Sequence, residues 1–186
     1  GLDLSGEGGS VWIKNRGSTG ANHHWFNTAN GRALNIMPNQ NNVQTSTSSQ
    51  DLKSFNNNGF TLNATAYNTN INVNNGNYVS WSFRKAPNFF DVVTYSSNQS
   101  SSQTISHNLG SVPGMIIVKR TSADANWAVY HRGADSSNPE QYALNLNTTG
   151  ERNQGSSFWN NTAPTSSQFT VGNNASTNDS DPADYV

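Results

Sequence analysis

Apolar residues occur along this chain in short runs in which they alternate with polar residues. In the segment 78–83 the odd-numbered residues Val79, Trp81 and Phe83 are large and apolar, whereas the even-numbered ones are tyrosine or serine. Successive side chains of a β-strand point to opposite faces, so this alternation predicts a strand with one apolar face. Similar segments, separated by Asn, Ser and Gly, predict further strands at 10–14, 24–26, 32–36, 59–62, 71–73, 89–95, 103–107 and 115–119.

The composition supports an all-β fold with many turns. Asn, Ser and Thr make up 72 of the 186 residues, and five Trp, six Tyr and eight Phe are spread through the chain. No long window repeats apolar residues at helical spacing. The sequence therefore predicts an all-β fold of duplicated β-sandwich or jelly-roll-like units packed together, with little or no helix.

An internal repeat runs through the predicted strands. The segment 11–16, which reads VWIKNR, corresponds to 116–120, which reads IIVKR, and further matches follow in the same order at offsets of about 104 to 110 residues. The repeat predicts a first β unit at 1–87, connecting strands at 88–112 and a second, related unit at 113–186. The further matches pair Ala33–Ile36 with Ala143–Leu146, Phe60–Leu62 with Phe169–Val171, and Tyr78–Val79 with Tyr185–Val186.

The second unit is predicted to be truncated relative to the first. Its last two residues, Tyr185 and Val186, correspond to the start of the alternating strand 78–83. A sheet that lacks this strand would have an open edge with unpaired backbone groups. We therefore expect further residues or a longer polypeptide around this chain.

Charge and composition exclude several classes of function. Ten basic and eleven acidic residues give a net charge of -1, so no basic field is present to bind a nucleic acid. No apolar run approaches the roughly 20 residues of a membrane-spanning helix, and membrane insertion is not expected. The chain has no Cys, which excludes disulfides and thiolate metal sites. No cofactor is predicted.

Several segments together resemble a repeat domain of bacteriophage structural proteins, especially tail-fibre and other virion proteins of marine and cyanobacterial phages. The resemblance is most specific between residues 90 and 172, and the stretch 178–184 departs from it because it is more acidic. The matching segments are VWIKNR with HHWF, FDVVTY, SHNLGSVPGMIIVKR, NWAVYHRG, LNLNTT and FWNNTAPTSSQFTVG.

The resemblance implies a non-enzymatic virion protein located on the particle surface. The lead hypothesis is a tail-fibre or adhesin module that contributes to recognition of a host cell-surface glycan. It would act as a homo-oligomer, with a trimer favoured, beside other virion proteins, because repetition strengthens weak contacts. The alternative is a structural protein that decorates a capsid or builds an extracellular filament without binding glycan.

A glycan-binding surface needs exposed aromatic rings for the apolar faces of sugars and planar amides for their hydroxyl groups. The alternative for each aromatic residue is a place in the core, where Trp and Tyr contribute large buried areas. If neighbours such as Trp25 and Phe26, or Phe158 and Trp159, lie on strands, one ring of each pair faces outward or packs against another subunit. The candidate glycan-binding residues are Trp127, Tyr130, His131, Arg132, Trp159, Asn160 and Asn161.

Two further kinds of site have weaker support in the sequence. Asp179, Asp181 and Asp184 offer oxygen ligands of the kind that calcium prefers, but the stretch lacks the glycine and bidentate Glu of a calcium-binding loop. Glycan hydrolysis needs two facing carboxylates, and most acidic residues lie in predicted turns. Asp91 lies on a predicted strand without an acidic partner, and no catalytic residue is predicted.

Overall fold

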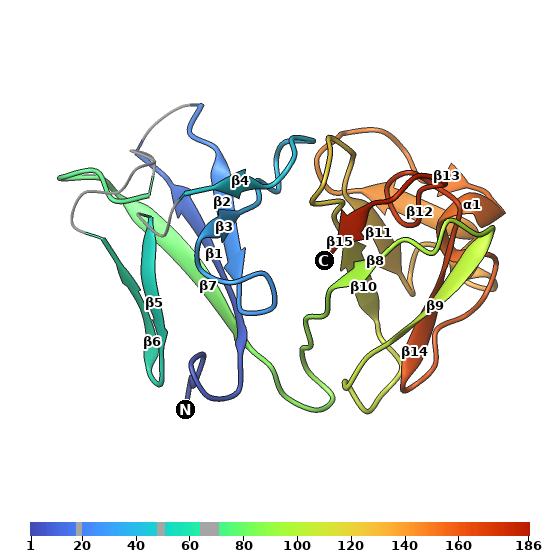
Figure 1. The fold of residues 1–186 in the computed structure, drawn as a ribbon, viewed down its shortest axis with the longest axis horizontal. Coiled ribbons are helices and arrows are strands. Elements are labelled where there is room, and N and C mark those ends of the chain that lie inside the picture. Colours follow the sequence, from blue (N-terminus) through green and yellow to red (C-terminus); the bar gives the residue numbers. More distant parts are fainter. Residues whose placement is uncertain (18–19, 48–50, 64–70) are drawn as a thin grey trace. The chain divides into compact units, whose positions relative to one another are not determined.

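The computed structural model describes residues 1–17, 20–47, 51–63 and 71–186, and this part of the chain is nearly all β. The chain forms two compact units (Figure 1): unit 1 comprises residues 1–40 and 44–92, and unit 2 comprises residues 41–43 and 93–186. The predicted connecting segment 88–112 is therefore not a separate element, because its strands pair within unit 2.

Unit 1 is built on an antiparallel sheet in the order β2-β1-β7, formed by His23–Asn27, Gly9–Asn15 and Tyr78–Arg84. A bridge between Trp25 and Ile36 joins β2 to the end of β3 (Leu34–Asn35), which pairs with β4 (Thr45–Ser46). The predicted strands at 10–14, 24–26 and 78–83 are confirmed.

A second layer covers one face of this sheet. The hairpin of β5 (Leu52–Asn56) and β6 (Gly59–Leu62) lies opposite the strands β1 and β7 (Figure 1). Apolar side chains fill the space between the layers, and each contributes about 1.5–3 kcal/mol by leaving water. The buried members of this cluster are Leu4, Val11, Ile13, Phe26, Leu52 and Ile71.

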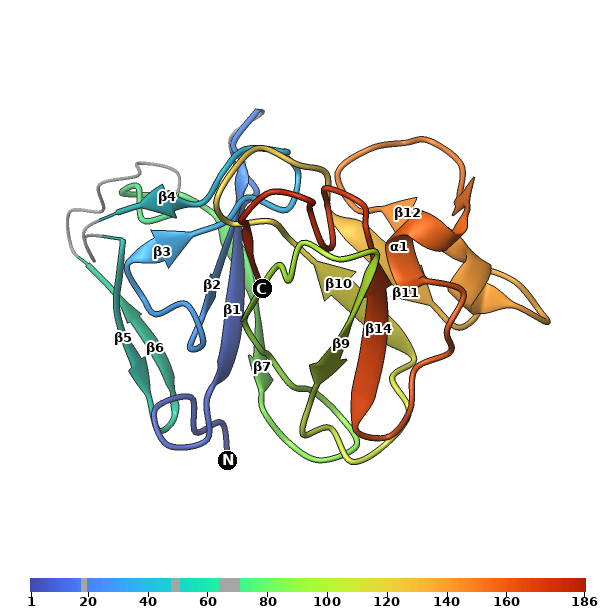
Figure 2. The same cartoon turned by 45° about the vertical axis from the view of Figure 1, so that its right-hand side comes forward.

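Unit 2 contains a four-stranded antiparallel sheet in the order β10-β11-β12-β13, formed by Met115–Val118, Ala128–His131, Tyr142–Asn145 and Asn153–Gln154. Two further pairs complete the unit: β9 with β14 (Ser102–Ser106 and Gln168–Gly172), side by side in Figure 2, and β8 with β15 (Tyr95–Ser96 and Asp184–Tyr185).

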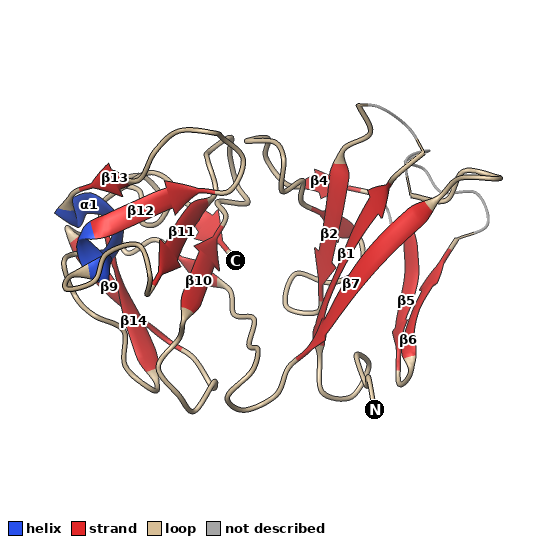
Figure 3. Ribbon diagram, turned by 180° about the vertical axis from the view of Figure 1, so that it is seen from behind, coloured by secondary structure: helices blue, strands red, loops and turns tan. Residues whose placement is uncertain are grey.

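Over the described residues, helix is limited to two single turns, drawn among the strands in Figure 3. A 3-10 turn spans Pro139–Gln141, and the α-helical turn α1 spans Ser156–Trp159. Phe158 and Trp159 therefore do not lie on a strand, and the condition for one ring on each face of a sheet is not met. Trp159 instead points into the core of unit 2 from the helical turn.

The two units repeat the same strand order. In unit 1 the strands follow one another as β7-β1-β2-β3-β4, where β2 and β3 are joined by the bridge at Trp25. In unit 2 the order is β15-β10-β11-β12-β13, where β15 contacts the chain just after β10 through a bridge between Arg120 and Tyr185. The matched segments at β1, β2, β3 and β7 thus have counterparts at corresponding places in unit 2.

Three predictions of secondary structure need correction. Residues 71–73 are not a strand: Ile71 and Asn72 form a bend, and a turn follows at Asn74 and Asn75. The segment 89–95 is not continuous, because Pro87 and Asn88 form a turn closed by a bridge between Ala86 and Phe90, and pairing resumes only at Tyr95. The pattern also failed to predict β5, whose alternation is weak because Lys53, Ser54 and Asn56 surround a single aromatic ring.

Candidate functional site

Three tryptophans lie in register across the sheet of unit 1. Trp12, on the central strand β1, is opposite Trp25 of β2 on one side and opposite Trp81 of β7 on the other. Residues directly opposite each other in an antiparallel pair share a face of the sheet. We call this set, Trp12, Trp25 and Trp81, the tryptophan row.

The rings of the tryptophan row contact one another. Trp12 stacks on Trp25 with ring centroids 5.1 Å apart and planes at 13°, and Trp81 meets Trp12 edge to face at 5.8 Å and 65°. Both geometries are favourable for aromatic pairs and contribute about 0.5–1.5 kcal/mol beyond burial. The contacts hold the indoles in fixed orientations.

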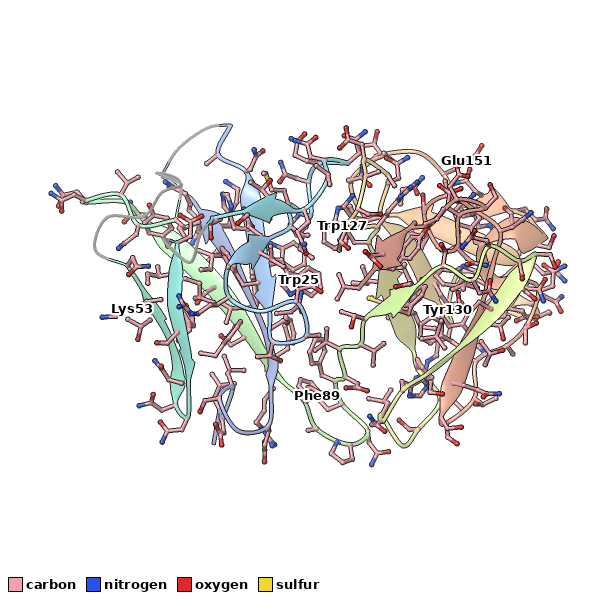
Figure 4. All side chains as sticks on the ribbon, viewed as in Figure 1. Trp25, Lys53, Phe89, Trp127, Tyr130 and Glu151 are labelled. Atoms are coloured by element: carbon pink, nitrogen blue, oxygen red, sulfur yellow. The ribbon has the colours of Figure 1, made fainter. Side chains whose placement is uncertain are left out.

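The tryptophan row occupies the face of the sheet that points away from the core of unit 1. Val11 and Ile13, on either side of Trp12 in the sequence, are buried beneath the hairpin β5–β6. Figure 4 shows Trp25 on the opposite side of the sheet from this hairpin, which carries Lys53. Trp81 is the most accessible ring, with 46% of its surface exposed. The prediction that Trp25 and Phe26 face opposite sides is confirmed, because Phe26 is fully buried in the core.

A histidine and a lysine border the tryptophan row. His23 lies opposite Lys14 in the register of β1 and β2, two pairs along from Trp12 and Trp25 and therefore on the same face of the sheet. The indole Nε1–H of Trp12 donates a hydrogen bond of 3.0 Å to Nδ1 of His23. Partial burial, together with the charge of Lys14, lowers the pKa of His23, so its ring stays neutral and accepts this hydrogen bond at neutral pH.

Side-chain amides continue this surface next to His23. The amide oxygen of Asn39 accepts a hydrogen bond of 2.8 Å from the backbone N–H of His23. The oxygen of Asn22 in turn accepts hydrogen bonds from the amide groups of Asn39, at 2.9 Å, and Gln40, at 3.2 Å. Unit 1 thus combines ordered aromatic rings with a fixed cluster of amides, which is the chemistry that a sugar-binding surface requires.

Unit 2 does not repeat the tryptophan row. Ile117 of β10 corresponds to Trp12, and its partner Val129 of β11 corresponds to Trp25. The two sheets share their strand order, so the fold itself does not require tryptophan at these positions. The three indoles are therefore a special feature of unit 1.

The predicted glycan-binding rings of unit 2 are core residues, and this part of the prediction needs correction. Trp127 and Trp159 are each 2% exposed and Tyr130 is 4% exposed, so none of them has a ring face available to a sugar. Trp159 packs edge to face on Tyr130 and donates its indole N–H to the carbonyl oxygen of Tyr142 at 3.0 Å. Figure 4 labels Trp127 and Tyr130 within unit 2.

The polar members of the predicted site do not gather around an exposed ring. His131 ends β11, where its Nδ1 accepts a hydrogen bond from the N–H of Gly133, and Arg132 is exposed beyond it. Asn160 and Asn161 are exposed at the end of α1, where both adopt the left-handed conformation. Asn tolerates this conformation better than most residues, which accounts for the pair structurally.

The three aspartates proposed for calcium do not form a cation site. Asp179 makes an ion pair with Arg120 at 2.5 Å, and Asp184 accepts a hydrogen bond of 2.7 Å from the hydroxyl of Ser96. Asp181 is exposed. Over the described ranges, no three His, Cys, Asp or Glu side chains come together in a way that could hold a metal ion.

Unit 1 also contains an open cleft of about 560 Å³ beside the N-terminal loop, lined in part by Glu7, Arg32 and Lys85. Its charges are paired: Glu7 binds Arg84, and Lys85 binds Asp91 at 2.9 Å. Glu7 is the one acidic residue among those lining the cleft.

In the described part of the chain, no helix is long and apolar enough to cross a membrane.

Residues 4–186 match a protein family described as a domain of unknown function, DUF7483. The chain belongs to the DUF7483 family. The matched residues span both units of the chain. No curated protein matches the chain, and no solved structure matches it.

Sequence reasoning missed the tryptophan row because it depends on strand pairing. Trp12, Trp25 and Trp81 lie in separate segments of the sequence. The alternation within each segment does not show which of the three tryptophans share a face of the sheet. The register between strands determines which of them share a face. The one available signal was the strand 78–83, whose apolar residues were correctly predicted to share a face, although this face lies opposite the core.

Proposed function

We propose that this DUF7483 chain is a non-enzymatic binding module of a bacteriophage virion, in which unit 1 contacts a host cell-surface glycan. The observation that carries the proposal is the tryptophan row on the face of unit 1 that points away from its core. The resemblance of the sequence to phage tail-fibre repeats supplies the biological setting.

The chemistry of the row suits a saccharide. The C–H groups of a pyranose ring pack on an indole face, and Trp81, with 46% of its surface exposed, offers the most accessible ring. The amides of Asn22 and Asn39 lie beside His23 at the border of the row, where they can bind hydroxyl groups. Because the surrounding charge is low, we propose a glycan recognised by stacking and hydrogen bonds rather than by ion pairs.

A single shallow surface of this kind binds a sugar weakly. We propose that the chain acts as a homo-oligomer, with a trimer favoured, on the surface of the virion beside other virion proteins. Several copies that bind at once convert weak contacts into firm attachment without any new contact. The two-layer packing of sheet and hairpin in unit 1 is consistent with a sandwich-like architecture, which we propose for each unit.

A printed array of bacterial lipopolysaccharides and capsular polysaccharides tests this proposal, probed with the wild-type chain and two variants. Trp81→Ala removes the accessible ring of the row. Phe89→Ala removes another exposed aromatic ring of unit 1, at 65% exposure, that does not belong to the row. We expect wild type and Phe89→Ala to bind the same glycans and Trp81→Ala to bind them about 10-fold or more weakly, equivalent to about 1.4 kcal/mol.

Two outcomes would contradict the proposal. Binding that Trp81→Ala leaves unchanged would exclude the tryptophan row as the site. If no glycan bound the wild-type chain, even when it was displayed in many copies on beads, the structural role in a capsid or filament would be preferred. The exposed ring of Trp81 would then be a contact between subunits.

A further inference from the structure

One edge of the sheet in unit 2 is open where the matching edge in unit 1 is covered. β10 pairs with β11 on one side. On its other side, pairing begins only after the strand ends, where Lys119 and Val186 exchange two backbone hydrogen bonds of 2.8 and 3.0 Å. The bridge between Arg120 and Tyr185 and a hydrogen bond from Thr121 N–H to Asp184 continue this pairing away from β10.

The alternation of hydrogen bonds identifies the backbone groups at the open edge. Lys119 and Thr121 direct their N–H groups toward β15, whereas the carbonyl oxygen of Gly114 accepts from Arg132, which follows β11. Odd-numbered residues of this stretch therefore face the open edge, and even-numbered residues face β11. On that basis Met115 and Ile117 direct their N–H and C=O groups outward, and no described residue provides a backbone partner for them.

Unit 1 shows what occupies the same edge. There β7 pairs with β1 along its whole length, and this pairing includes Val79 opposite Lys14, the counterpart of Val186 opposite Lys119. The pairing then continues with Trp81 opposite Trp12, the counterpart of Ile117. A strand in this register would satisfy the outward groups of β10.

The side chains of the edge define what such a strand must carry. Ile116 and Val118 face the core of unit 2, and their counterparts in unit 1 are paired with the small residues Ser80 and Ser82. Met115, on the other face, is 54% exposed. The segment 115–118 contains no charge or proline, the usual means by which edge strands resist pairing.

We propose that the open edge of β10 binds an extended, antiparallel peptide strand in which small residues alternate with large apolar ones. The small residues lie over Ile116 and Val118, and the large apolar residues pack beside Met115 and Ile117. Main-chain hydrogen bonds provide the affinity, and the alternation of side chains provides the specificity. This interaction is independent of the glycan surface in unit 1.

A synthetic peptide with the sequence of residues 80–85, SWSFRK, tests the proposal on the full 186-residue chain. In the register of unit 1, its tryptophan and phenylalanine pair with Ile117 and Met115. We expect saturable binding and amide hydrogen exchange at least about 10-fold slower at Met115 and Ile117, with little change at Ile116 and Val118, whose N–H groups already face β11.

Two N-methylated peptides serve as matched probes that leave the protein unchanged. Methylation of the tryptophan and phenylalanine nitrogens blocks the groups that face β10, and we expect it to abolish protection. Methylation of the two serine nitrogens blocks groups that face away, and we expect binding to persist. Equal binding of both methylated peptides, or no protection at Met115 and Ile117 at saturating peptide, would overturn the proposal. It would also be overturned if the free chain already protected these amides while self-associating, because a second copy would then occupy the edge.

Discussion

The side-chain amide of Asn35 donates a hydrogen bond of 2.9 Å to Nδ1 of His24 inside unit 1, where both residues are almost completely buried. His24 lies on the core face of β2, opposite Ile13. Burial lowers its pKa from about 6.5 to about 4. The ring is therefore neutral in the folded chain at neutral pH, and Nδ1 is free of a proton to accept the Asn35 hydrogen bond.

This arrangement predicts a loss of stability in mild acid. Between pH 6.5 and 4 the unfolded chain binds a proton at His24 and the folded chain does not, so the free energy of unfolding falls as pH decreases through this window. The full effect is on the order of 3 kcal/mol. Urea unfolding followed by circular dichroism at pH 7, 5.5 and 4 measures it. His24→Gln should remove this part of the pH dependence, whereas His131→Gln should retain it; a slope unchanged in His24→Gln would refute the assignment.

Lys119 predicts a gain of stability in alkali. Its side chain is buried and donates hydrogen bonds of 2.9 Å to the carbonyl oxygens of Asn41 and Ala125. Burial lowers its pKa from 10.5 to about 8. Above pH 8 the folded chain has released this proton while the unfolded chain still holds it, so the contribution of Lys119 to stability rises up to pH 10.5.

Lys119→Met isolates this contribution. The variant should be less stable than wild type at pH 7 by about 1–3 kcal/mol, because the two hydrogen bonds from the charged amine to the carbonyl groups of Asn41 and Ala125 are lost. Its deficit should then widen by on the order of 2 kcal/mol at pH 9.5, because only wild type gains from deprotonation. Urea unfolding of both proteins at the two pH values provides the comparison. A deficit that is constant or shrinks with pH would show that Lys119 is not the titrating group.

The tryptophans of the two units should differ in their contribution to stability. Trp159 fills the core of unit 2, so Trp159→Ala should lower the free energy of unfolding by about 3–5 kcal/mol. Trp81 is nearly half exposed, and Trp81→Ala should cost about 1 kcal/mol or less. Thermal or urea unfolding of the two variants tests this. If Trp81→Ala destabilised the chain as strongly as Trp159→Ala, the tryptophan row would be a structural core.

The sequence was sufficient to predict several strands, such as β1, β2 and β7, and the repeated order of segments, because both depend on local patterns. Alternation at 78–83 identified β7, and the ordered matches anticipated that Tyr185 and Val186 would occupy the place of Tyr78 and Val79. The segment 89–95 was predicted as a strand from its apolar residues, but a Pro-Asn turn interrupts its pairing.

The site could not be predicted in the same way, because it depends on contacts between distant strands. Trp127 and Trp159 each have an Asn neighbour in sequence, yet both are buried, and Trp159 packs in the core of unit 2. Trp81 has similar neighbours and is exposed, since β7 directs its apolar side chains away from the core. Which tryptophan is accessible follows from strand register, and strand register is not contained in the local pattern.

The five tryptophans of the chain allow a direct test of the central claim, that unit 1 binds glycan through the tryptophan row. The measurement is an NMR titration of the indole N–H signals, with 15N-labelled protein and the oligosaccharide that binds most strongly on the array. The account predicts that the signals of Trp12, Trp25 and Trp81 shift in a saturable manner, while those of Trp127 and Trp159 stay in place. Shifts confined to Trp127 and Trp159, or no indole shift at saturating ligand, would contradict it.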